Sequence, residues 1–200
     1  KYTSSTYLNK KFGKKDVLKI GYNADYYIAD LSDSITENDT LPGVYRTRWS
    51  AKESFALVQS YIQWKHKFSD DFIFIAGLHN QSFTLSNSHS WAQPRAAIKW
   101  TLNANNALSL GVGRHSQTLP IYTYFYQLEG NTEAHNKGMD YMKSNHAVLG
   151  YSRKISKNLS AKVETYYQDL SNIPVEINPS SFSLINQGSG FSRFFPDSLE

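Results

Sequence analysis

The chain has no cysteine among its 200 residues and only two methionines. The lack of cysteine excludes disulfides, thiolate metal ligands and cysteine nucleophiles. It also fits a compartment in which free thiols would be oxidised. Long apolar runs are missing as well, and the longest, "FIFIAGL" at 72–78, is far too short for a membrane helix. A membrane strand remains possible because its signal is only an alternation of apolar and polar residues.

A run of one charge is also absent. The 21 basic and 17 acidic residues are spread along the chain and give a net charge of +4. We therefore expect no nucleic-acid partner. The sequence starts without a charged and then apolar segment, so it carries no signal peptide.

Aromatic residues are abundant, with 14 Tyr, 11 Phe and 4 Trp, and they favour strands. Apolar and polar residues alternate with a period of two. In "VLKIGYNADYYIAD" (17–30), Leu18 and Ile20 fall on one face and Lys19 and Gly21 on the other. The same alternation runs through 95–102, 107–114, 146–155 and 159–170. No helical pattern extends beyond two turns.

Short and long connections alternate between these strands. Tight turns are expected at 13–16, 69–71, 103–106 and 156–158. Longer stretches lie near 31–52, 86–91 and 117–143, and from 171 onward. An up-and-down antiparallel sheet with its tight turns at one end has this pattern, and outer-membrane barrels share it.

Strand length and side-chain placement favour a barrel. About 11 residues tilted by about 45° rise about 25 Å, the height of the apolar band of a membrane barrel. Strands of soluble sandwiches are nearer five or six residues. We predict that the basic residues opposite the apolar set face inward, namely Lys19, Arg95, Lys99 and Lys162. A girdle of aromatic residues is expected from Trp64, Phe68, Phe72, Phe74, Trp100 and Tyr151.

The predicted fold class is all-β: an antiparallel up-and-down meander of long strands forming a partial outer-membrane β-barrel. A soluble sheet with one face on a core and one in water is the alternative. That alternative corresponds to a ligand-binding module of the carbohydrate-binding type.

Several stretches resemble a known family. They are "PRAAIKW" (94–100), "GRHSQTLPIYTYF" (113–125), "KSNHAVLGYSRKISKNLSAKVETYYQDLSNIPVE" (143–176) and "SSFSLINQGSGF" (180–191). Together they resemble the barrel region of TonB-dependent outer-membrane receptors of the Bacteroidetes type.

The resemblance implies a 22-stranded barrel closed around an N-terminal plug, with nutrient import powered through TonB. This sequence shows no plug, no TonB-contacting segment and no closing aromatic strand. We therefore expect residues 1–200 to be an internal part of a single transmembrane barrel domain. The implied partners are outer-membrane lipid, a small-molecule or oligosaccharide ligand, and TonB through a part of the receptor outside this chain.

Catalytic, metal and cofactor motifs are not found, so we expect no enzyme, no metal and no cofactor. The best catalytic material is His79 with Ser82, or His115 with Ser116. Residues at odd spacing on a strand point to opposite faces, which separates both pairs. An outer-membrane barrel hydrolase is therefore the third interpretation, after the receptor and the soluble module.

Ligand contact is the preferred chemistry, on the long loops and at the mouth of the lumen. Mixed aromatic and polar groups on loops suit sugars, siderophores or peptides. Aromatics folded onto a barrel rim would give the same pattern. The candidate contact residues are Arg46, Arg48, Trp49, His115, Gln117, Tyr122, Tyr124 and Tyr126.

Overall fold

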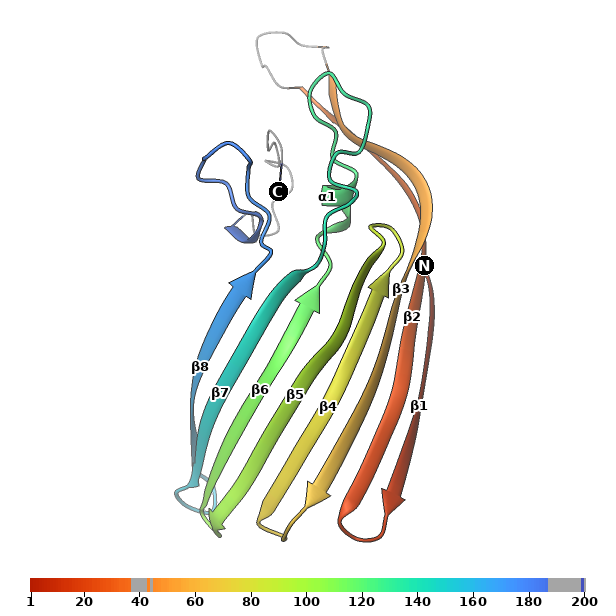
Figure 1. The fold of residues 1–200 in the computed structure, drawn as a ribbon. Helices are drawn as coiled ribbons and strands as arrows, with labels where there is room; N and C mark the ends of the chain where they lie inside the picture. Colours follow the sequence, from red (N-terminus) through yellow and green to blue (C-terminus); the bar gives the residue numbers. More distant parts are fainter. Residues whose placement is uncertain (37–42, 44, 187–198, 200) are drawn as a thin grey trace.

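The protein folds as one long-stranded sheet (Figure 1). The computed structural model describes residues 1–36, 43, 45–186 and 199. Its strands are β1 (Tyr2–Phe12), β2 (Asp16–Ile35), β3 (Arg46–Lys67), β4 (Phe72–Phe83), β5 (Ser88–Asn103), β6 (Asn106–Gln117), β7 (Met142–Lys154) and β8 (Ser160–Ser171). A short helix, α1 (Ile121–Tyr124), and a 3-10 turn, η1 (Leu184–Asn186), lie outside the sheet.

The strands pair in chain order, each antiparallel to the next, so the predicted up-and-down meander is confirmed. All four predicted tight turns lie at one end, which we call the lower end (Figure 1). Within the part of the chain that the structure describes, β1 and β8 do not pair, and the sheet is open. Neither helix of the described residues is long and apolar enough to cross a membrane.

Two predicted loops were placed too widely. The stretch near 31–52 contains the upper ends of β2 and β3, which pair from Leu31 with Ala51 to Ile35 with Arg46. The stretch near 86–91 contains the start of β5 at Ser88. In both cases two neighbouring strands continue to bond each other beyond the clean alternation, across irregular registers at Asp33/Ser34 and at His79/Gln81.

The two faces of the sheet differ along every strand. Antiparallel partners project to the same side, so one row of paired residues crosses all eight strands. The inner row is polar or glycine throughout: Asn9, Lys19, Gln63, Gly77, Arg95, Gly113, His146 and Gln168. The next row faces outward and is apolar on seven strands: Leu18, Trp64, Ala76, Ala96, Val112, Ala147 and Tyr167.

The predicted inward placement of the basic residues is confirmed. Lys19 and Arg95 belong to the inner row, Lys99 pairs with Ser109, and Lys162 pairs with Ser152 on the same face. The ammonium of Lys19 lies 4.5 Å from the centre of the Tyr7 ring.

Aromatic side chains form a belt on the outer face near the lower end, as predicted. Ring centres are 6.1 Å apart for Trp64 and Phe74, and 6.4 Å for Phe72 and Trp100. Phe68 lies 5.5 Å from Phe72. Tyr151 continues the belt on β7, where its hydroxyl donates to Asn106 of the neighbouring strand.

The buried core lies at the upper end, against the inner face. Segment 118–141 folds over this face, beginning with α1, whose first turn is closed by the Thr123 amide donating to the Pro120 carbonyl at 2.9 Å. Phe55 of β3 stacks on Tyr27 at 5.2 Å and meets Phe83 of β4 edge-on at 5.5 Å. The segment therefore plugs part of the space inside the curve of the sheet.

Candidate functional site

The rim of the sheet is built by segment 118–141 joining the upper end of β3. The Gln127 amide donates to the Arg48 carbonyl at 2.7 Å, and Trp49 and Tyr126 form an isolated antiparallel bridge. The ring of Trp49 also lies 5.6 Å from that of Tyr122. A loop predicted at 117–143 is thus held in place as a short extension of the sheet.

Two arginines tie this rim together. Arg48 is 2% exposed, donates from Nε to Asp33 Oδ2 at 2.5 Å, and lies over the Trp49 ring at 4.5 Å. Arg46 donates to the Tyr126 hydroxyl at 3.1 Å. A carboxylate on the facing strand and an aromatic face together offset the cost of burying the Arg48 charge.

Two tyrosines anchor the segment from beneath. The Tyr124 hydroxyl accepts the Leu119 amide at 3.1 Å, and the Tyr141 hydroxyl donates to the Ser88 carbonyl at 3.3 Å. Both residues are 0% exposed. Burial raises the pKa of each phenol above its ordinary value, so both stay neutral well beyond physiological pH.

The candidate contact residues therefore divide into two groups. Six of the eight lie in or around the rim: Arg46, Arg48, Trp49, Tyr122, Tyr124 and Tyr126. Trp49, Tyr124 and Tyr126 are at most 5% exposed, so they shape the rim from within. Tyr122 is half-buried and Arg46 keeps 18% of its side chain exposed, which leaves these two with surface at the rim.

The other two candidates, His115 and Gln117, lie on β6. The ring of His115 is 4.8 Å from that of His146 on β7, and Gln117 pairs with Met142 at the end of the strand. Gly113 leaves room beside them, because a Cβ there would lie 3.2 Å from both Arg95 Cγ and His115 Nε2. Arg95, His115 and His146 therefore share one basic patch on the inner face.

A pocket of ≈ 250 Å³ opens on the same inner face. Its polar lining comes from four strands and consists of Asn23, Tyr61, Gln63, His79 and Arg95. No carboxylate of the described residues forms an ion pair with Arg95. The inner wall thus presents a cation and several hydrogen-bonding groups to whatever occupies the lumen.

Sequence reasoning had not singled out this pocket. Its residues stand 16 or more positions apart from one strand to the next, and only the register between strands brings them together. The inward orientation of Arg95 was the one available signal.

The serine and histidine pairs weighed from the sequence are not joined in the structure. Ser116 instead accepts from Gln81 Nε2 at 3.0 Å and donates its amide to Gln93. Ser82 hydrogen-bonds at 2.9 Å to Nδ1 of His89, its partner in the ladder, rather than to His79. Across the described ranges, no three His, Cys, Asp or Glu side chains are grouped to hold a metal ion.

Comparison with known proteins identifies the fold. No protein-family model and no curated protein matches the chain. The ferric enterobactin receptor PfeA in complex with BCV-L6 matches 84% of it, with a TM-score of 0.63 at 17% identity. A mutant of that receptor from Pseudomonas aeruginosa matches 84% with a TM-score of 0.61 at 15% identity. Another from the same organism, in complex with enterobactin, matches 84% with a TM-score of 0.63 at 17% identity.

The chain covers 26% of each of these receptor chains, about a quarter of their length. At such identities the likeness concerns the fold alone. The chain has the fold of a stretch of the wall of a receptor β-barrel, as the sequence pattern predicted.

Proposed function

We propose that residues 1–200 form part of the wall of a TonB-dependent receptor barrel in the outer membrane, with a role in nutrient uptake. The observation that carries the proposal is the pair of adjacent rows, one polar and one apolar, that crosses the eight strands. Such a sheet satisfies a lipid phase outside and a polar lumen inside. The quoted motifs support the Bacteroidetes-type branch of this family.

The proposed ligand is a small molecule of the siderophore or oligosaccharide type, bound and not chemically changed. The basic inner patch of Arg95, His115 and His146 favours ligands rich in anionic or other acceptor oxygens. At the rim, Arg46 and Tyr122 offer exposed contact groups, while Arg48, Trp49, Tyr124 and Tyr126 hold them in place. TonB would engage through a part of the receptor outside this chain.

Uptake by living cells tests this proposal. A strain lacking the gene is compared with one complemented by the complete gene, using radiolabelled ferric siderophores and labelled oligosaccharides, with and without TonB. We expect outer-membrane localisation and TonB-dependent accumulation of at least one compound. Recovery of the protein in the soluble fraction would overturn the proposal.

The inner patch has its own variant and control. Arg95→Gln removes the inward cation, whereas Lys162→Gln removes another inward cation on β8, away from the pocket. We expect the first to reduce ligand binding by about ten-fold, and the second to leave it near wild type. Equal losses in both would contradict a specific contact at Arg95.

A further inference from the structure

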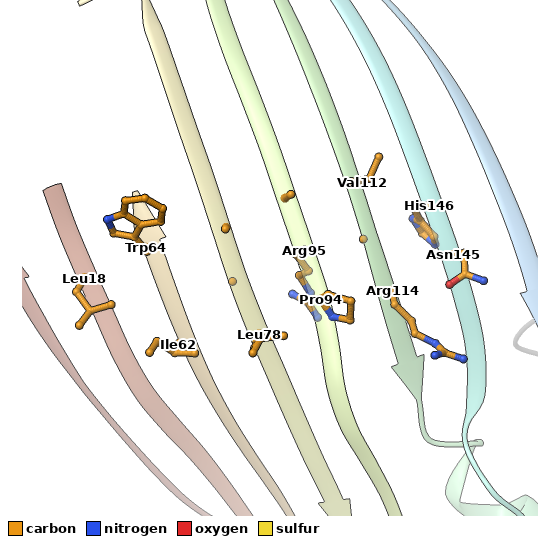
Figure 2. Close-up of a pocket in the computed structure, with 14 residues that line it drawn as sticks. Leu18, Ile62, Trp64, Leu78, Pro94, Arg95, Val112, Arg114, Asn145 and His146 are labelled. Carbon is orange, nitrogen blue, oxygen red and sulfur yellow. The ribbon is translucent and has the colours of Figure 1, made fainter. Parts of the chain in front are cut away.

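The outer face carries a long groove that the receptor role does not use. It has a volume of ≈ 820 Å³ and runs over β3 to β6 (Figure 2). Small residues, Ala76, Gly77 and Ala96, form its floor, between larger side chains such as Ile62 and Val112. Its shape comes from the narrow residues of the apolar row, which leave a depression where neighbouring strands carry bulky ones.

The two ends of the groove differ chemically. Trp64 lies at the lower end, where its indole N–H donates to Asp16 Oδ1 at 2.9 Å. Arg114 and its ladder partner Asn145 lie at the upper end. Asn145 donates to Asp169 at 3.3 Å, whereas Arg114 is exposed and forms no ion pair with any carboxylate of the described residues.

Arg114 stands where the outer face changes from apolar to polar. Going up β6, the outward residues are Leu108, Leu110 and Val112, followed by Arg114 and Ser116. On β7 the same change occurs between Ala147 and Asn145. An apolar band ending in a polar row marks the level of lipid headgroups, where an arginine meets phosphate without the cost of mid-depth burial.

We propose that this groove binds an anionic phospholipid of the surrounding membrane, an inference that rests on the proposed function. One acyl chain lies along Ala76, Ala96 and Val112, and the phosphate meets the guanidinium of Arg114. The fork of arginine donors fits a phosphate, and the groove matches an alkyl chain in polarity. The six strands from β2 to β7 are interior to the sheet, so their outer face is not a sheet edge awaiting another strand.

Quenching of Trp64 by brominated lipids tests the site. The protein, expressed in full from its gene, is purified in nonionic detergent with Trp91→Phe and Trp100→Phe, which removes the other exposed indoles. Brominated phosphatidylglycerol and brominated phosphatidylcholine are then titrated separately. We expect the anionic lipid to reach half-maximal quenching at roughly five-fold lower lipid fraction.

Arg114→Gln should remove that preference. The matched control is Arg153→Gln, on the same outer face but at the lower end of β7, which should preserve it. Filling the floor by Ala96→Phe should weaken quenching by both lipids, whereas Ala161→Phe on β8 should not. A preference that survives Arg114→Gln, or that Arg153→Gln abolishes equally, overturns the proposal.

The same titration separates this inference from the receptor role. Equal quenching by both lipids shows an outer face in lipid and overturns only the anionic site. Absence of quenching by either lipid means that the face does not meet lipid, and both proposals then fail. If light scattering also shows a doubled protein mass, a second copy of the chain covers the groove.

Discussion

Single glycines decide how closely side chains cross the inner face. At Gly21 of β2, an added Cβ would lie 2.6 Å from the Tyr61 hydroxyl and 2.9 Å from the Thr6 carbonyl oxygen. Tyr61 therefore lies flat across the neighbouring strand because no side chain stands there. Gly111 of β6 is different, since no atom lies within 4 Å of the position its Cβ would take.

This contrast gives the first prediction. Gly21→Ala should destabilise the folded protein by about 1–3 kcal/mol, because Tyr61 and a backbone oxygen must both move. Gly111→Ala should be neutral or slightly stabilising, since it only restricts the unfolded chain. Urea unfolding of the two variants in lipid vesicles, followed by tryptophan fluorescence, measures both effects. Similar losses in the two variants would contradict the packing shown at Gly21.

Tyr124 and Tyr141 give the rim a dependence on alkaline pH. Burial raises the pKa of both phenols, so the folded state favours their neutral form. Their contribution to stability is complete below the ordinary tyrosine pKa of about 10 and is lost as the pH rises through the folded-state values.

We therefore expect the rim to loosen only in strongly alkaline solution. The fluorescence of Trp49, in a variant with the other tryptophans replaced by Phe, reports this through its contact with Tyr122. Tyr124→Phe with Tyr141→Phe should lower stability at neutral pH by about 1–3 kcal/mol, through two lost hydrogen bonds. The same double variant should also weaken the alkaline transition. A transition of unchanged amplitude would show that other groups cause it.

At the scale of the strand, the alternation on β6 sets what each position tolerates. Leu110 faces outward within the apolar band, and its chain neighbour Gly111 faces the lumen. Leu110→Arg should cost about 2–4 kcal/mol of folding free energy in a bilayer, the penalty for a cation on the lipid face. Gly111→Arg should cost little, because its side chain enters open polar space. Folding yields in vesicles distinguish the two, and equal yields would contradict the assigned faces.

The sequence predicted the strands, the tight turns and the faces well, because each depends on residues near one another in the chain. Asn, Asp, Gly and Ser mark the turns, and the alternation assigns Lys19 and Arg95 to the inner face. The ends of β2 and β3 were missed because they are set by hydrogen bonds between two strands. The partnership of Ser82 with His89 depends on the β4–β5 register in the same way.

The candidate site was only partly predictable for the same reason. Arg46, Arg48, Trp49, Tyr122, Tyr124 and Tyr126 were selected by type, and they do gather at one rim. That several of them are buried follows from how segment 118–141 folds onto the sheet. Alternation along one strand carries no information on such packing.

For the whole molecule, the outer face governs behaviour in solution. Large apolar residues remain exposed on it, among them Ile20 at 44%, Val112 at 48% and Leu149 at 51%. A contiguous apolar surface of this kind is a membrane or partner surface. We expect the complete protein to stay dispersed in detergent and to aggregate when detergent is removed, as measured by light scattering. A stable monomer in plain buffer would instead favour the soluble-module interpretation.

The hairpin of β2 and β3 gives the wall an uneven upper edge. Pairing of β3 with β4 starts at Leu57, whereas β3 itself begins at Arg46 and bonds only β2 over that interval (Figure 1). At about 3.3 Å per residue, the hairpin runs roughly 35 Å past the pairing with β4. In a cell envelope it would be the first part of this wall that an antibody or a bacteriophage tail meets. Immune pressure and phage predation would then act on this hairpin more strongly than on the rest of the sheet.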